Sequence, residues 1–114
     1  MHRHLGPGLL ESTYLSCLQD ELSDRELRYA TQRSLPVVYK GRTLDTAYRV
    51  DLIVEELVVV ELKSVDQLLP VHQSQVLTYL RLANCPVGLL INFKVAKLSD
   101  GVKRLLRPRR DAPP

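Results

Sequence analysis

A chain of 114 residues has the size of one domain, and 45% hydrophobic with 25% charged residues is the balance of a globular protein of low net charge, here +3. The longest uninterrupted apolar run, residues 57–60, is far too short to cross a bilayer, and residues 1–8 lack the apolar stretch of a signal peptide. We therefore predict a cytoplasmic protein with no membrane association. The cysteines, Cys17 and Cys85, have no partner motif, which favours buried free thiols over a disulfide or a metal site.

The first predicted element is an amphipathic helix that follows a breaker at Gly6-Pro7-Gly8. From Leu10 onward apolar residues recur three and four positions apart, as one face of a helix requires, and the pattern ends near Arg28. A strand over residues 35–39 comes next. Pro36 near the start of that strand favours an edge position in a sheet, because proline cannot donate to a ladder of hydrogen bonds.

Two hairpins are predicted to join three successive strands. Residues 40–42, Lys-Gly-Arg, are a turn signal between the strand at 35–39 and a second strand at about 43–54. Glu55-Glu56 is a polar break, and a third strand over residues 57–63 follows at once. The three strands therefore form an antiparallel arrangement.

The rest of the chain has the layout of a crossover between parallel strands. A helix is predicted over residues 71–83 and is stopped by Asn84-Cys85-Pro86. The apolar run at 87–93 is typical of a strand covered on both faces. Residues 97–106 hold one last strand or a short edge segment, with a turn at Asp100-Gly101. The order helix, three strands, helix, strand predicts an α/β fold with a mixed central sheet flanked by helices.

Much of the basic excess lies at the C-terminal end, where five basic residues gather. They are Lys103, Arg104, Arg107, Arg109 and Arg110. Such a segment suits contact with phosphates. The alternative is a solvated tail without regular structure, which three prolines in the same stretch favour. We expect a single domain over residues 1–106 and a basic tail at 107–114.

Three charged residues on the second and third strands carry the predicted chemistry. If the turn between these strands centres on Glu56, Asp51 lies opposite Glu61, and opposed residues have Cβ atoms about 5 Å apart. Glu61 and Lys63 are two positions apart and so point to one face. Two carboxylates suit a hard cation such as Mg²⁺ or Mn²⁺, to which the carbonyl of Leu62 can add an oxygen. Lys63 can hold a water and offset charge on a phosphate, as phosphodiester hydrolysis requires.

A structural ion pair is the alternative interpretation, because Glu-x-Lys is a common pattern in strands. The apolar neighbours weigh against it, since unpaired charges among such residues are costly. These expected core neighbours are Leu52, Ile53, Val58, Val59, Val60 and Leu62.

Four segments in order resemble the GxxExxY family of the PD-(D/E)XK nuclease superfamily. They are Gly8-Leu9-Leu10-Glu11-Ser12-Thr13-Tyr14, Tyr48-Arg49-Val50-Asp51-Leu52-Ile53-Val54, Val60-Glu61-Leu62-Lys63-Ser64 and Leu69-Pro70-Val71-His72-Gln73-Ser74-Gln75. The resemblance extends from about residue 5 to residue 106. It implies a restriction-endonuclease-like core in the order predicted above, with Asp51 and Glu61 as metal ligands and Lys63 as the catalytic lysine.

Glu11 is a further candidate for the metal site. It shares a helical stripe with Leu15, Leu18 and Leu22, so it can face the sheet. The resemblance implies that this glutamate joins the metal ligands. The alternative is a first-turn acid that interacts favourably with the helix dipole.

Four residues are candidates for contact with substrate. Gln75 and Tyr79 form Q-x-x-x-Y on one helix face, and this pair resembles a motif of some superfamily nucleases. His72 lies one turn before Gln75, with a structural or exposed role as the alternative. Arg49 lies two positions before Asp51 and can bind phosphate or pair with a carboxylate.

These features predict a Mg²⁺- or Mn²⁺-dependent nuclease that acts on nucleic acid, most readily DNA, and they leave a homodimer open. The alternative is a catalytically inactive module that keeps the fold and binds nucleic acid or protein. The presence of all three residues Asp51, Glu61 and Lys63 favours the enzyme.

Overall fold

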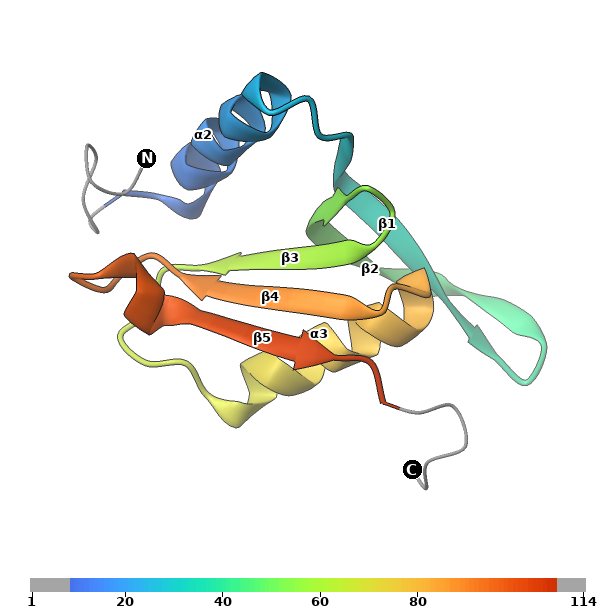
Figure 1. The fold of residues 1–114 in the computed structure, drawn as a ribbon. Helices are drawn as coiled ribbons and strands as arrows, with labels where there is room; N and C mark the ends of the chain where they lie inside the picture. Colours follow the sequence, from blue (N-terminus) through green and yellow to red (C-terminus); the bar gives the residue numbers. More distant parts are fainter. Residues whose placement is uncertain (1–8, 109–114) are drawn as a thin grey trace.

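The computed structural model describes residues 9–108, so the predicted breaker at residues 6–8 and the tail from residue 109 onward lie outside the described residues. Helices and strands follow one another in the predicted order (Figure 1). In chain order they are α2 (Glu11–Asp24), β1 (Tyr29–Tyr39), β2 (Arg42–Val54), β3 (Val58–Lys63), α3 (Pro70–Ala83), β4 (Val87–Asn92), the 3-10 helix η1 (Leu98–Gly101) and β5 (Val102–Leu106).

The five strands form one mixed sheet in the order β1-β2-β3-β4-β5. Strands β3 and β4, which α3 connects, are parallel, and every other neighbouring pair is antiparallel. The predicted α/β class, the mixed sheet and the edge position of the first strand are therefore confirmed. For residues 97–106 the sequence predicted either a last strand or a short edge segment. The structure has a strand there, β5, which pairs with β4.

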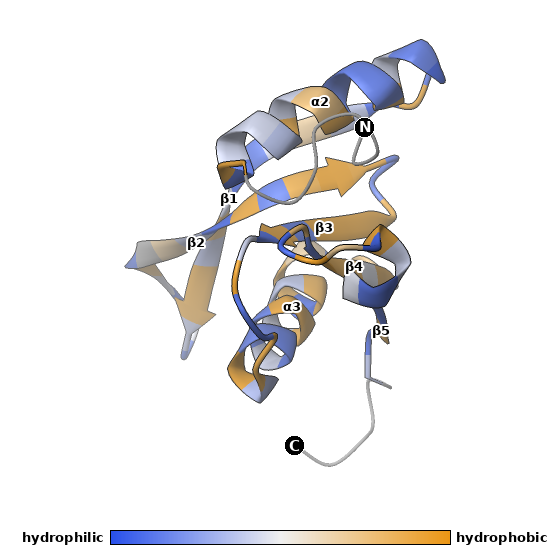
Figure 2. Ribbon diagram, turned by 90° about the vertical axis from the view of Figure 1, so that its left-hand side faces the viewer, coloured by the Kyte–Doolittle hydropathy of each residue, from blue (hydrophilic) through white to orange (hydrophobic). Residues whose placement is uncertain are grey.

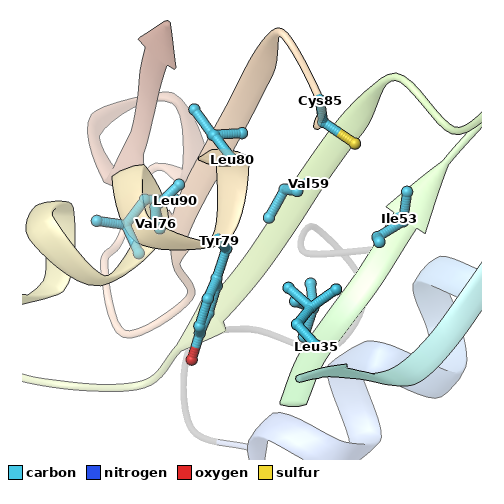
Figure 3. Close-up of a cluster of buried hydrophobic side chains, with 9 residues drawn as sticks. Leu35, Ile53, Val59, Val76, Tyr79, Leu80, Cys85 and Leu90 are labelled. Atoms are coloured by element: carbon cyan, nitrogen blue, oxygen red, sulfur yellow. The ribbon is translucent and has the colours of Figure 1, made fainter. Parts of the chain in front are cut away.

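Two hydrophobic cores cover the two faces of the sheet. One lies under α3 and contains Val59 and Leu90, and Figure 3 shows its side chains between that helix and the strands. The other lies under α2 and contains Val60, Leu62 and their neighbours. Alternate residues of β3 and β4 thus enter opposite cores, and both strands are largely hydrophobic in Figure 2. Strand β4 is therefore covered on both faces, as its continuous apolar run predicted.

The turn between β2 and β3 has the geometry that the sequence predicted. It spans residues 55–57, and Glu55 and Glu56 both have positive φ, 53° and 55°. Leu52 then pairs with Val60, and the same register carries Asp51 opposite Glu61. Arg28 and Arg33 form ion pairs with the two turn glutamates.

The ladder of backbone hydrogen bonds between β2 and β3 is short, so the two strands separate beyond it. It ends at Leu52, whereas β2 remains paired with β1 as far as Arg42. The β1–β2 hairpin therefore separates from β3 and projects from the rest of the sheet (Figure 1). Asp51 is the first residue of β2 beyond the shared ladder, so it lies at the fork.

The first helix is shorter than predicted, and the first strand starts earlier. The helix ends at Asp24, because Glu26 adopts a left-handed conformation at φ 58° and Leu27 N–H donates to the Leu22 carbonyl. Glycine usually marks such an ending, and no glycine lies near Glu26, so this ending was not predictable from the residue types. Tyr29 then pairs with Val54, which adds six residues to the start of the strand predicted at 35–39.

Both cysteines are free, with Cys85 buried and Cys17 half-buried, in agreement with the predicted thiols. Among residues 9–108, no helix combines the length and the apolar character that a membrane span requires.

Candidate active site

The side chains of Asp51 and Glu61 connect β2 and β3 at the point where the two strands separate. The Asp51 backbone N–H donates to Glu61 Oε1 at 3.3 Å, and the Leu62 N–H donates to Asp51 Oδ2 at 2.9 Å. Each carboxylate therefore takes over a backbone hydrogen bond that the separating strands no longer make to each other. These two bonds use one oxygen of each carboxylate and do not involve the other two, Asp51 Oδ1 and Glu61 Oε2.

Glu61 is unusual for a charged residue because only 4% of it is exposed. Burial, and then the neighbouring Asp51 carboxylate, raise the pKa of the Glu61 carboxyl to about 8. Two acidic groups crowded in this way favour the arrival of a cation.

Lys63 supplies positive charge beside this pair. Its Nζ lies 3.7 Å from Glu61 Oε2, and its side chain is 19% exposed. Lys63 and Glu61 occupy the face of β3 that carries Val59 and is covered by α3. The predicted placement of both on one face is thus confirmed, and the lysine reaches solvent at the edge of the site.

The donor set is compatible with a hard divalent cation, which prefers carboxylate oxygens and keeps several waters. Asp51 and Glu61 offer two carboxylates. Within residues 9–108, however, no group of three or more Asp, Glu, His or Cys side chains is arranged to hold a metal. Backbone oxygens or waters must complete any coordination sphere, and the predicted Leu62 carbonyl stays a candidate for this.

Helix α3 forms the wall that faces the carboxylates. Tyr79 is almost fully buried, and Figure 3 shows its hydroxyl at the rim of the core under α3. Burial, with a further contribution from Glu61, raises the pKa of the Tyr79 hydroxyl to about 12, while a hydrogen bond from Gln75 acts against the rise. Gln75 and Tyr79 thus adjoin the carboxylate pair, and Tyr79 keeps its proton at neutral pH.

Glu11 contacts the end of β3 from the other face of the sheet, and within residues 9–108 it does not form a three-residue cluster with Asp51 and Glu61. Its helix, α2, packs on the core that contains Leu62, and Glu11 Oε1 accepts a hydrogen bond of 3.0 Å from the backbone N–H of Ser64. Ser64 directly follows Lys63, so Glu11 anchors the end of the strand that carries the lysine. Three residues later, Tyr14 is fully buried and its ring stacks on Phe93 with centroids 4.1 Å apart.

Arg49 and His72 have different surroundings from each other. Arg49 is exposed on β2, and within the described part of the chain it forms no ion pair with either carboxylate. The Nδ1 atom of His72 accepts a hydrogen bond of 2.9 Å from the Leu69 N–H, so His72 caps the start of α3, where Pro70 is the first helical residue. His72 therefore has the structural role that the sequence offered as the alternative to substrate contact.

Replacing His72 with alanine is expected to lower the free energy of unfolding by about 1 kcal/mol, because the Leu69 N–H loses its acceptor. Urea unfolding followed by circular dichroism measures the change. Gln73→Ala, on the neighbouring position of α3, is the control and should differ from the wild type by less than about 0.5 kcal/mol. Equal stability of His72→Ala and wild type would show that the cap is not needed.

Two residues beside the site were not among the predicted site residues. Asn92 is 3% exposed, pairs in register with Lys63, and bonds through its side chain to both the N–H and the carbonyl of Val65. A polar residue that ends the apolar run of β4 was the available signal. Tyr48 packs edge-to-face against Tyr79, and nothing in the local pattern of β2 set it apart.

Comparison with known proteins identifies the family. A model described as PD-(D/E)XK nuclease superfamily matches residues 1–105. This chain belongs to the PD-(D/E)XK nuclease superfamily. Divalent metals are the usual cofactors of its nucleases, which agrees with the oxygen donors at the fork.

A similar fold is found in a solved structure. The crystal structure of SSO0001 superposes on the chain with a TM-score of 0.65 and 20% sequence identity, covering 88% of this chain and 51% of that one. The chain therefore spans about half the length of SSO0001. No curated protein matches the chain. At this identity the likeness to SSO0001 concerns the fold alone, and it supports the PD-(D/E)XK core described above.

Proposed function

We propose that the chain is a metal-dependent nuclease that hydrolyses phosphodiester bonds of DNA, and that it belongs to the GxxExxY group within the superfamily. The single observation that supports this best is the arrangement at the fork. Asp51 and the buried Glu61 interact directly, and Lys63 Nζ lies 3.7 Å from Glu61 Oε2. A structural ion pair alone would not explain two acidic groups crowded together with a raised pKa.

In this proposal Asp51 and Glu61 hold Mg²⁺ or Mn²⁺, with the Leu62 carbonyl and waters as further ligands. When bound, the metal polarises the phosphate and lowers the pKa of a water. Lys63 orients the attacking water and offsets charge that develops on the phosphate. Gln75, Tyr79, His72 and Arg49 are the proposed substrate contacts. The homodimer that the sequence left open stays a prediction.

Glu11 is proposed to complete the site from the α2 side. Its hydrogen bond to Ser64 N–H fixes the backbone next to Lys63. Glu11 and Tyr14 then have separate tasks on α2. Tyr14 packs the helix against the core, and Glu11 binds the backbone at the end of β3. A direct role of Glu11 as a metal ligand stays part of the proposal.

A non-catalytic binding module is the second candidate. The observation in its favour is that, within residues 9–108, no third acidic, histidine or cysteine side chain joins Asp51 and Glu61. The purified chain with Mg²⁺ or Mn²⁺ tests the choice on duplex, single-stranded and branched DNA and on RNA. Metal-dependent cleavage that chelation abolishes supports the nuclease. Binding without cleavage of any of these substrates would favour the module.

Deleting residues 107–114 is expected to reduce the salt dependence of DNA binding. The deletion removes Arg107, Arg109 and Arg110, and each lost phosphate contact lowers the slope of log affinity against log salt by about 0.7–0.9. The slope should therefore decrease by roughly 2 to 3. A variant with Arg25 and Arg28 replaced by alanine is the control, because their charges are already paired with Glu21 and Glu55. An unchanged slope in the deletion would show that the tail does not contact DNA.

A further inference from the structure

An open groove lies between β2 and the first turns of α3, beside the carboxylate pair. Its volume is about 330 Å³, and it is lined by Tyr48, Val71, His72, Ser74, Gln75 and Thr78. This volume is at the lower end of the range for ligand pockets, roughly 300–1,000 Å³. A groove of this size accepts a small planar group but not the width of a nucleic-acid duplex.

Tyr48 forms the aromatic side of the groove. It is 44% exposed although it packs against the buried Tyr79, with ring centroids 5.7 Å apart and an angle of 60° between the rings. Edge-to-face packing of this kind holds a ring in one orientation. An exposed aromatic ring that is held in place is a stacking platform for a nucleobase, since every base has a π face.

The α3 side of the groove carries polar groups beside the exposed Val71. His72 uses Nδ1 as the acceptor for Leu69 N–H, which places its ring hydrogen on Nε2 as a donor. The Gln75 amide lies one helical turn before Tyr79 on α3 and offers both hydrogen-bond donors and an acceptor to the groove. Donors and acceptors opposite a ring suit the edge of a base, which carries both. An aliphatic ligand would leave them without partners.

The groove adjoins the candidate active site through two residues of α3. Gln75 lines the groove and contacts Tyr79, and the Tyr79 hydroxyl is influenced by Glu61 and Asp51. A base stacked on Tyr48 would thus lie beside the face of α3 that carries Gln75 and Tyr79, next to the carboxylates.

We infer that the groove binds an unpaired nucleobase by stacking on Tyr48, so that the substrate is a single strand rather than an intact duplex. The claim that the bound strand is the substrate rests on the proposed nuclease function. Binding of a base in the groove requires neither metal nor cleavage. Tyr48 is then the residue that selects between paired and unpaired substrates.

Binding of a short fluorescein-labelled oligodeoxythymidine, followed by anisotropy in the presence of EDTA, tests the inference. Tyr48→Leu is expected to weaken binding about 5- to 100-fold, the usual effect of losing one stacked base. Tyr48→Phe keeps the ring and should stay within about twofold of the wild type. Tyr39→Leu is the matched control, because Tyr39 is an exposed tyrosine at the tip of the same hairpin and contacts Lys40 rather than the groove.

Three further substrates make the result decisive. The wild type should bind an RNA strand of the same length comparably, and bind a duplex or an abasic strand more weakly. This comparison uses only the wild type, so it holds even if Tyr48→Leu does not fold, which melting curves reveal. Equal binding of abasic and normal strands, or equal affinity of a folded Tyr48→Leu variant, would overturn the inference.

Failure of the inference and failure of the proposed function are distinguishable. Binding that depends on Tyr48 without metal-dependent cleavage would defeat the nuclease proposal and leave the base site in place. Cleavage with binding that is indifferent to Tyr48 would defeat the base site and leave the nuclease.

Discussion

Lys63→Ala is expected to lower metal-dependent cleavage by about 10²–10⁴-fold, the usual contribution of a positioned proton-transfer or charge-stabilising group. The reason is the position of Lys63 Nζ, 3.7 Å from Glu61 Oε2 at the edge of the site, where it can orient a water and approach a phosphate. Metal binding should remain, because the carboxylates are unchanged. Single-turnover cleavage measures the first expectation, and calorimetric titration with Mn²⁺ measures the second.

Asp51→Asn separates the two roles. A neutral amide is a poorer ligand for a hard cation, so this variant should lose metal affinity as well as activity, whereas Lys63→Ala should lose activity alone. Lys94→Ala is the matched control, since Lys94 also pairs with a carboxylate, that of Asp66, but on the exposed surface. It should cleave like the wild type.

Folding must be measured with activity, because removing one partner of a buried pair can change stability in either direction. Lys63→Met keeps most of the aliphatic stem and provides a second variant if Lys63→Ala melts early. Cleavage by a folded Lys63→Ala or Lys63→Met variant at the wild-type rate would refute the role assigned to the lysine.

Glu61→Gln is expected to stabilise the metal-free protein at alkaline pH. In the folded chain the pKa of the Glu61 carboxyl is about 8, against an ordinary value of 4.5. The folded state therefore holds its proton where the unfolded state has lost it. Stability from this group is fully present below about pH 4.5 and is lost as the pH rises to about 8, by at most about 1.4 kcal/mol per pH unit.

The glutamine variant has no charge to bury, so its stability should not show this loss. Urea unfolding in EDTA between pH 5 and about 9 compares the two proteins, and the difference in the free energy of unfolding should grow up to about pH 8 and then level off. Added Mg²⁺ at about pH 8 should raise the melting temperature of the wild type and not that of Glu61→Gln. Parallel stability curves for both proteins across this range would show that Glu61 is not perturbed by burial and Asp51.

The sequence was sufficient for the features that depend on neighbours along the chain. The helix over residues 70–83 and the strands around the site follow from the spacing of apolar residues. The register of Asp51 opposite Glu61 follows from the length of one turn, because a hairpin with a short turn has only one way to pair and a slip would move every side chain to the other face. The placement of Glu61 and Lys63 on one face was predictable for the same reason.

Only the tertiary structure decided the features that depend on contacts between distant segments. Glu26 ends α2 in a conformation that glycine usually adopts, because the chain must turn into β1 at that point. The raised pKa of Glu61 requires α3 above it and Asp51 beside it, and neither is encoded in the Glu-x-Lys pattern. The role proposed for Tyr48 depends on packing on Tyr79, which is 31 positions away in the chain. Burial and proximity across the fold set these properties, and periodicity along one strand carries no information about them.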